Sequence, residues 1–196
     1  MIALQETRLS NDDNQRKNDR FIRIVDANAR VFWFPISEAS GHNGVGLILS
    51  SHHPFGPIVN VTSLHINQSV HDPYLLLDTS IMSQRIWMHV VYAPSHLPER
   101  LSFFQSLPHD GPAGLQHIVL GDFDVPLNPT LDSSKQRHSG ADIEALPRWT
   151  MQMGLTDAWR TTHPYFKEYT GPRRRNRIDY CFLSSELLRL SDPDRS

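Results

Sequence analysis

The sequence predicts a layered α/β protein in which two mostly antiparallel sheets carry helices on their outer faces. Eight short runs rich in Val, Ile, Trp, Phe and Tyr are bounded by Gly, Pro, Asn and Ser, as strands usually are. Only four stretches have helical character, and this excess of strands fits a sandwich better than an alternating parallel sheet. The length of 196 residues is about that of one domain, so we expect a single domain over residues 1–196.

The expected elements follow in chain order from these runs. The predicted strands are residues 2–6, 30–34, 45–50, 58–66, 74–78, 85–93, 117–123 and 177–183. The predicted helices are the polar stretch 10–20, the segment 99–107 after Pro98, residues 141–155 and the short stretch 185–190. Pro147 either breaks or starts the pattern of the third helix. The polar stretch 132–142 predicts a long surface loop.

Composition excludes several classes of protein. Hydrophobic residues make up 39% of the chain and charged residues 20%, and no window is apolar for long enough to cross a bilayer. A net charge of −2 excludes a globally basic nucleic-acid binder but leaves room for a local basic patch. The first residues lack the features of a signal or transit peptide, so we expect an intracellular protein of the nucleus or cytoplasm. The single cysteine, Cys181, lies in an apolar run and is expected to be a small core residue.

Two carboxylates follow predicted strands directly. Glu6 comes after the strand-like run IALQ, and Asp122 ends the run HIVLGD. Side chains at strand ends can converge on one rim of a sheet, and carboxylate oxygens suit Mg²⁺, which takes one or two of them and leaves its other positions to water and phosphate. Taken singly, each residue is as easily explained as a solvated turn residue.

Four stretches taken in order give a more specific prediction. LQET at 4–7, VVYAP at 90–94, VLGDFDVPLN at 119–128 and RRNRIDYCFLS at 174–184 together resemble the endonuclease/exonuclease/phosphatase superfamily. DAWRTTHP at 157–164, followed by YTGPRRRNRIDY, is similar to the endonuclease domains of non-LTR retrotransposons, relatives of the abasic-site nucleases. The resemblance implies a DNase I-like, four-layered α/β/β/α sandwich that hydrolyses phosphodiester bonds in DNA. It also implies Mg²⁺ as the cofactor, with Mn²⁺ as a substitute. It implies no membrane and no obligate protein partner.

The resemblance also implies roles for particular residues. Glu6 matches the metal-binding glutamate, and Tyr92 matches a tyrosine whose hydroxyl contacts the scissile phosphate. Asp122 matches the aspartate that orients or activates the attacking water. Asp179 matches the aspartate that hydrogen-bonds a catalytic histidine and fixes its tautomer. Without the resemblance, Tyr92 is better explained as a half-buried strand aromatic.

A basic run precedes Asp179. Arg173, Arg174, Arg175 and Arg177 could neutralise DNA phosphates and make affinity depend on salt. A solvated turn explains the same run equally well.

Asp124 departs from the family pattern, which has a neutral asparagine at this position. If the strand continues, Asp122 and Asp124 share a face and place two carboxylates side by side. A further negative charge about 4 Å from the reacting phosphate would cost about 4 kcal/mol at an effective dielectric of about 20. This corresponds to roughly a thousandfold in rate. The sequence therefore predicts that Asp124→Asn raises activity.

The ends of the chain depart from the pattern as well. The family carries Ser-Asp-His well beyond the RIDY aspartate, whereas only 17 residues follow Asp179 here and Pro193 stands where the histidine would be. The family's first strand, with a metal-site asparagine, precedes its QET motif and has no match. We therefore expect an incomplete domain lacking the first and last strands, with weak or no catalysis. The alternatives are an inactive nucleic-acid-binding remnant and a phosphatase or phosphodiesterase of the same superfamily.

Overall fold

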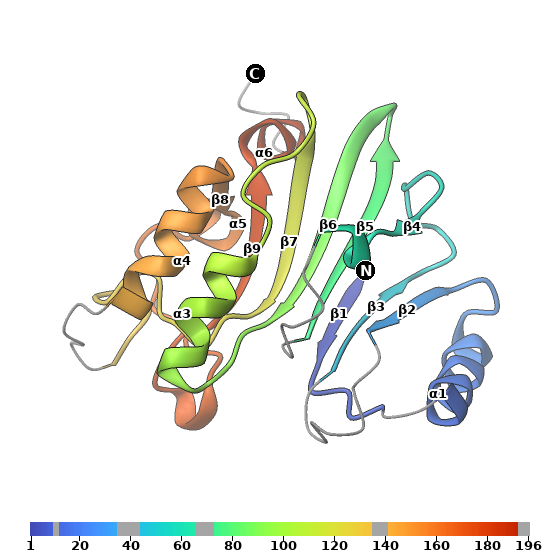
Figure 1. Ribbon diagram of the computed structural model, residues 1–196, viewed down its shortest axis with the longest axis horizontal. Coiled ribbons are helices and arrows are strands. Elements are labelled where there is room, and N and C mark those ends of the chain that lie inside the picture. Colours follow the sequence, from blue (N-terminus) through green and yellow to red (C-terminus); the bar gives the residue numbers. More distant parts are fainter. Residues whose placement is uncertain (10–11, 35–43, 66–72, 135–140, 192–196) are drawn as a thin grey trace.

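Two sheets stacked face to face form the centre of the molecule (Figure 1). The computed structural model describes residues 1–9, 12–34, 44–65, 73–134 and 141–191. The small sheet has the order β1-β3-β2 and is built from β1 (Ile2–Gln5), β2 (Arg30–Phe34) and β3 (Val45–Leu49). The large sheet has the order β4-β5-β6-β7-β9-β8 and is built from β4 (Val59–Asn60), β5 (Tyr74–Ile81), β6 (Gln84–Tyr92), β7 (Gln116–Asp122), β8 (Leu155–Asp157) and β9 (Asp179–Ser184). Within the described residues β6 and β7 are the one parallel pair, so the predicted sandwich of mostly antiparallel strands is confirmed.

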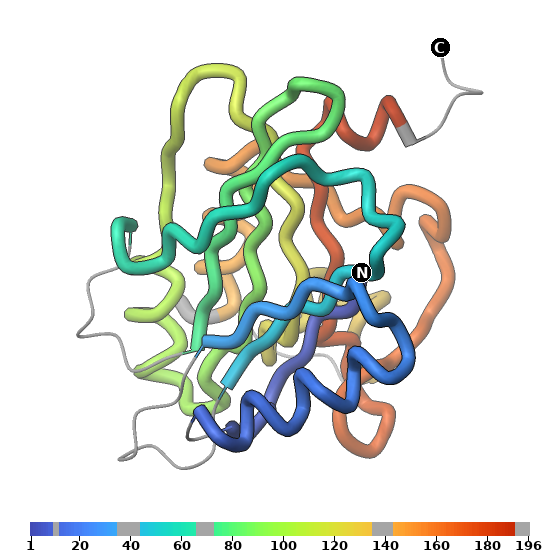
Figure 2. Tube along the Cα trace, turned by 90° about the vertical axis from the view of Figure 1, so that its right-hand side faces the viewer, coloured from blue at the N-terminus to red at the C-terminus, as the bar shows by residue number. Residues whose placement is uncertain are grey.

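Helices form the outer layers on both sides. They are α1 (Asp12–Val25), α2 (Thr62–His65), α3 (Leu97–Ser106), α4 (Ala141–Gln152), α5 (Ala158–Thr162) and α6 (Ser185–Ser191), with a 3-10 turn at Pro172–Arg174. Helices α3 and α4 cover the outer face of the large sheet, whereas α1 lies outside the small sheet (Figures 1 and 2). Among the described helices, none combines the length and apolar character that a membrane crossing requires.

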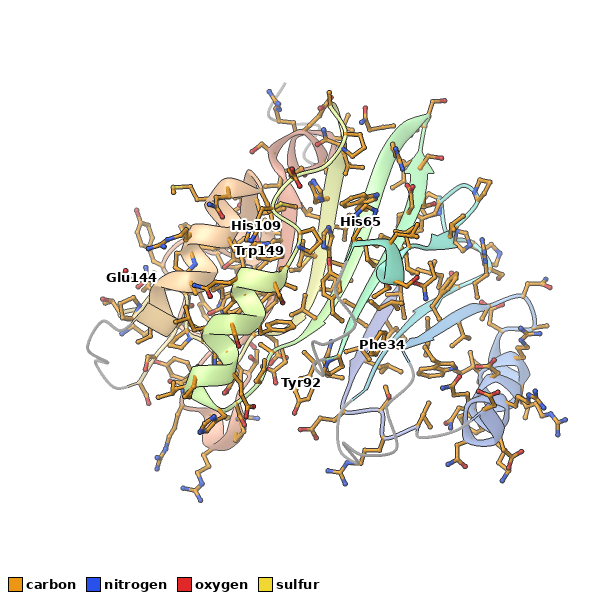
Figure 3. The ribbon with its side chains drawn as sticks, viewed as in Figure 1. Phe34, His65, Tyr92, His109, Glu144 and Trp149 are labelled. Carbon is orange, nitrogen blue, oxygen red and sulfur yellow. The ribbon has the colours of Figure 1, made fainter. Side chains whose placement is uncertain are left out.

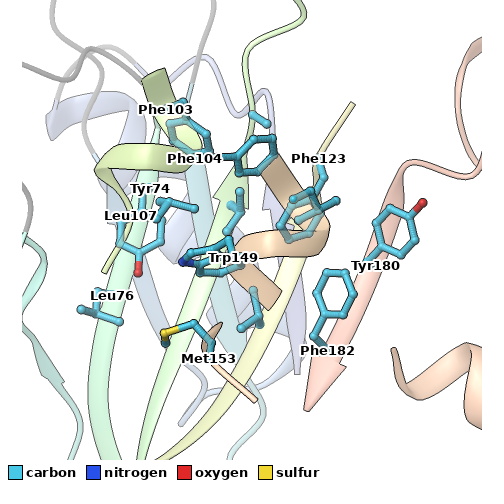
Figure 4. Packing of buried hydrophobic residues seen from close by; sticks show 14 of the residues in the cluster. Tyr74, Leu76, Phe103, Phe104, Leu107, Phe123, Trp149, Met153, Tyr180 and Phe182 are labelled. Atoms are coloured by element: carbon cyan, nitrogen blue, oxygen red, sulfur yellow. The ribbon is translucent and has the colours of Figure 1, made fainter. Parts of the chain in front are cut away.

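Two apolar cores hold the layers together. One lies between the large sheet and α3 and α4, where Phe103, Phe104 and Trp149 pack against strand side chains (Figure 4). The other lies between the two sheets. Alternate residues of β3 point into it, since Val45, Leu47 and Leu49 are buried while Ile48 is only partly covered, as the two-residue period of a strand requires.

The structure corrects several element boundaries. The expected strand 58–66 contains only β4, because the Asn60 side chain accepts hydrogen bonds from the backbone and hydroxyl of Thr62 and turns the chain into α2. Strand β8 was not predicted, since its three residues are too few to show a pattern. Pro147 lies inside α4. Residues 10–11, 66, 135–140 and 192–196, on which parts of the predictions fall, lie outside the described residues.

Candidate active site

Three of the predicted site residues are neighbours across the large sheet. Tyr92 ends β6, Asp122 ends β7 and Asp179 begins β9. In the strand register Tyr92 is opposite Asp122, and Asp122 is opposite Asp179. Opposed residues of paired strands point to the same face of a sheet, so these side chains form a row at one end of it. Tyr92 packs against the core between the sheets, so the row faces the small sheet. Figure 3 shows Tyr92 at this lower end of the molecule.

Glu6 reaches the row from the small sheet. It follows β1, which lies against β6 and β7. The Tyr92 hydroxyl donates a hydrogen bond of 2.6 Å to Glu6 Oε1. The Glu6 backbone is in the left-handed region with φ 51°, so the chain turns sharply where the strand ends. Residues far apart in the sequence therefore meet at one rim.

Gly121 allows the strands to approach closely just before the rim. A Cβ atom at this position would collide with the backbone carbonyl of Val91 on β6. Only glycine fits such an approach. This explains why the apolar run of β7 is interrupted by glycine immediately before Asp122.

The row is crowded with negative charge. The pKa of Asp122 is raised to about 7, chiefly by burial and to a smaller extent by the carboxylates of Asp179, Asp124 and Glu6, while the hydrogen bond from the Asp124 backbone N–H lowers it. Burial and the hydrogen bond to Glu6 raise the pKa of Tyr92 well above its ordinary value, so its hydroxyl stays neutral. The rim therefore holds a carboxyl group that can exchange a proton with water near neutral pH, next to a neutral hydroxyl donor.

Asp124 lies outside the strand, contrary to expectation. Strand β7 ends at Asp122, and Asp124 adopts φ 50°, so the two side chains do not continue one strand face. The Asp124 carboxylate forms an ion pair of 2.9 Å with Arg100, a buried residue of α3. The expectation that Asp124 places an uncompensated negative charge at the rim is thus wrong, because Arg100 compensates it. The reason for expecting Asp124→Asn to raise activity fails with it.

Arg177 is buried and is not an arginine of the rim. It is 3% exposed and binds the carboxylates of Asp132 and Asp157, while its guanidinium carbon lies 4.4 Å from the centre of the Tyr180 ring. Arg160 joins the same network through a 2.5 Å bond to Asp132. Because both carboxylates hold its guanidinium inside the protein, the expectation that Arg177 lies exposed on the rim is wrong.

The other three predicted arginines remain on the surface. Arg173, Arg174 and Arg175 are exposed, and the turn that carries them is closed by a hydrogen bond from Gly171 N–H to the Asn176 carbonyl. In the part of the chain that the structure describes, no ion pair joins these three to a carboxylate. The turn lies at the end of the large sheet where β6 and β7 finish and β9 starts (Figure 1). The placement suits contact with a polyanion that enters the rim.

Asp179 is held from the backbone side. The Thr170 hydroxyl accepts hydrogen bonds from the N–H groups of Ile178 and Asp179. Among the described residues, no histidine forms a hydrogen bond or ion pair with the Asp179 carboxylate. The orienting role implied by the resemblance is thus without its usual partner in this part of the chain.

The donor set at the rim fits a hard divalent cation. The described residues contain no group of three or more His, Cys, Asp and Glu side chains arranged to hold a metal ion. Mg²⁺ needs only one or two carboxylates, however, and completes its shell with water and phosphate. The Glu6 carboxylate is about half exposed. Burial is the main cause of the raised pKa of Asp122, but the carboxylates of Asp179, Asp124 and Glu6 add to it, and a bound cation would relieve this repulsion. Glu6 could therefore hold such an ion.

Sequence reasoning missed the buried charges behind the rim. Arg100, Asp132 and Asp157 were not singled out, although the DAWR stretch already contains Asp157 and Arg160. Their partners lie 20 to 45 residues away in the chain, and only the fold brings them together.

Comparison with known proteins agrees with this geometry. The pattern of the endonuclease/exonuclease/phosphatase family matches residues 1–195. The chain belongs to this family. The family comprises nucleases, phosphodiesterases and phosphatases, and its nucleases generally use divalent metal ions.

Solved structures of low sequence identity share the fold. A Neisseria 3′ phosphatase, NExo, bound to a product DNA hairpin is 17% identical with a TM-score of 0.63, over 95% of this chain and 76% of that one. The Xenopus laevis APE2 catalytic domain is 17% identical with a TM-score of 0.64, over 95% and 74%. The endonuclease domain of TRAS1, a telomere-specific non-LTR retrotransposon, is 14% identical with a TM-score of 0.52, over 83% and 68%.

Proposed function

We propose that this protein is a DNA endonuclease of retrotransposon type that hydrolyses phosphodiester bonds with Mg²⁺, for which Mn²⁺ can substitute. The observation that carries the proposal is the rim itself, where Tyr92, Asp122 and Asp179 stand in register and Glu6 is hydrogen-bonded to Tyr92. The exposed arginines at the same end and the likeness to DNA-processing structures support DNA as the substrate.

The chain's own residues account for most of the chemistry. The raised pKa of Tyr92 keeps its single hydroxyl proton in place. That proton is donated to Glu6 in this structure, and it would be free for a phosphate oxygen once the Glu6 carboxylate turned to a metal ion. Asp122, with its pKa near 7, accepts a proton from the attacking water. Arg173, Arg174 and Arg175 neutralise flanking phosphates. The metal, when bound, polarises a phosphoryl oxygen.

We propose further that catalysis is slow. Asp179 has no histidine partner among the described residues, so the group that would assist departure of the leaving oxygen is not supplied there. General acid and base groups typically contribute about 10²- to 10⁴-fold each, which sets the scale of the deficit.

Nicking of supercoiled plasmid DNA in the presence of Mg²⁺ tests the proposal. We expect Glu6→Gln and Asp122→Asn each to lower the nicking rate by about a hundredfold or more, because each removes a charge or proton acceptor that acts in the transition state. Glu144→Gln is the matched control, since Glu144 is exposed on α4 and remote from the rim (Figure 3). Nicking that Glu6→Gln leaves unchanged would contradict the proposal.

Two alternatives give different results in the same experiment. A phosphatase or phosphodiesterase for small molecules would hydrolyse a small phosphoester faster than it nicks DNA, in a Glu6-dependent manner. An inactive nucleic-acid-binding remnant would bind DNA with salt-dependent affinity but would leave plasmid intact at every metal concentration.

A further inference from the structure

Arg100 is a charged side chain buried behind the rim. It belongs to α3 and is 3% exposed, which is rare for arginine unless its charge is compensated. Its guanidinium donates four hydrogen bonds of 2.6–2.9 Å, to the carbonyls of Pro94, Ser95 and Asp124 and to the Asp124 carboxylate. Three of the four acceptors are backbone carbonyls, so Arg100 fixes the course of the main chain.

The two segments that Arg100 joins follow site residues directly. Pro94 and Ser95 lie in the loop after Tyr92, and Asp124 lies in the turn after Asp122. The Asp124 N–H in turn donates a 2.9 Å hydrogen bond to Asp122 Oδ1, so the position of Asp124 sets the orientation of the Asp122 carboxylate. Arg100 thus acts on both site residues through the backbone, since none of these four hydrogen bonds is to the side chain of Tyr92 or Asp122.

We propose that Arg100 is a positioning residue of the candidate active site, with Asp124 as its counterion. It holds the loops after β6 and β7 in one arrangement, so that Tyr92 and Asp122 present their oxygens to the same phosphate. Asp124 serves this arrangement and does not contact substrate. The inference rests on the proposed function for its catalytic consequence, but the fixing of the loops is measurable without any activity.

The chemistry of the guanidinium is specific for this role. Arginine has five N–H donors in a planar fork, whereas lysine has three donors on one atom and cannot reach four acceptors in this geometry. Arg100→Lys therefore keeps the charge and removes the geometry. A displacement of about 1 Å at a reacting group can lower a rate by about a hundredfold.

The kinetic test uses the full chain and supercoiled plasmid with Mg²⁺. We expect Arg100→Lys to lower kcat by about ten- to a hundredfold with little change in KM, measured below its melting temperature. Asp124→Asn is expected to lower activity too, because it removes the carboxylate that pairs with the buried Arg100 charge at 2.9 Å. The control is Arg85→Lys, which alters an exposed ion pair with Asp78 near the opposite end of β6 and should leave kcat and KM within twofold.

Backbone hydrogen exchange supplies a second readout that needs no catalysis. In Arg100→Lys we expect at least tenfold faster exchange at residues 93, 95 and 123–125, with unchanged exchange at residues 86–91 of β6. Faster exchange over the whole chain would mean a merely structural role, and unchanged kcat or unchanged loop exchange would equally overturn the inference. If the wild-type protein does not nick DNA, the proposed function fails, and the exchange result still decides whether Arg100 fixes the loops.

Discussion

The two sheets of this protein are anchored very differently. The large sheet is covered on both faces, and Leu76, Trp87 and Val90 of its central strands are almost completely buried. In the small sheet, among the residues that the structure describes, β1 pairs only with β3, and α1 outside the sheet has no buried residue. Phe21 and Ile24 of α1 remain exposed. Most of the stability therefore belongs to the large sheet and its helices, while Glu6, the residue proposed to bind metal, belongs to the less anchored part.

Breaking the charge network of the large sheet should have the largest effect. We expect Arg177→Met to lower the free energy of unfolding by about 3–5 kcal/mol, because it leaves Asp132 and Asp157 buried without their shared cation. Urea unfolding followed by circular dichroism measures this. Arg85→Met, which breaks an exposed pair, should cost less than about 1 kcal/mol. Equal losses in the two variants would mean that the buried network is not what anchors the large sheet.

The histidines buried in the large sheet should make its stability depend on pH. The Tyr74 hydroxyl, His89 and His117 form a hydrogen-bonded chain of 2.5 and 3.0 Å. Burial lowers the pKa of His117 to about 4 and also lowers that of His89. Both groups stay neutral in the folded protein, whereas they become protonated below about pH 6.5 in the unfolded chain. The contribution of these histidines to the free energy of unfolding is therefore fully present above pH 6.5 and is lost as the pH falls toward 4.

The size of this loss is measured as a difference between variants. Between pH 6.5 and 4, protonation of His117 in the unfolded chain alone should lower the free energy of unfolding by about 3 kcal/mol. The decrease over this range should therefore be smaller by that amount in His117→Gln. The difference is needed because Asp122, with its raised pKa, acts with the opposite sign in the same range. His96→Gln, at an exposed position, is the control. Identical pH profiles for wild type and His117→Gln would refute the prediction.

The smallest effect is expected at α1. The Trp33 indole N–H donates a 2.7 Å hydrogen bond to Asp19, which ties α1 to β2. Asp19→Ala should lower the free energy of unfolding by about 1 kcal/mol, because one partly buried hydrogen bond is lost. Hydrogen exchange should quicken across residues 12–25 and not in β6. Asp13→Ala, which removes an exposed pair with Lys17, should change stability by less than about 0.5 kcal/mol.

What the sequence predicted well is what depends on neighbouring residues. Short runs of strand-forming residues bounded by Gly, Pro, Asn and Ser, such as VGLIL at 45–49, are a local signal, so the strands and the layered sandwich could be predicted. The strand pattern placed Glu6 and Asp122 at strand ends that can share a rim, whereas Asp179 was expected there only from the family resemblance. The family resemblance added their proposed roles.

What the sequence could not predict depends on distant partners. Arg100 and Arg177 have the appearance of surface residues in the sequence, and their burial follows from carboxylates 24 and 45 residues away. The side chain of Asp124 could not be oriented from a strand pattern, because the strand ends two residues earlier in a left-handed turn. Charge pairing of this kind appears only once the fold is known.

The hydrogen bond between Glu6 and Tyr92 joins the two sheets. Glu6 directly follows β1, a strand of only four residues. Fraying of β1 would withdraw this acidic group while β6, β7 and α3 keep their packing. Inactivation on mild heating would then precede melting, and restoring the short strand on cooling would restore function without a refolding step. The proposed activity and the integrity of the folded protein would in this sense be governed by separate equilibria.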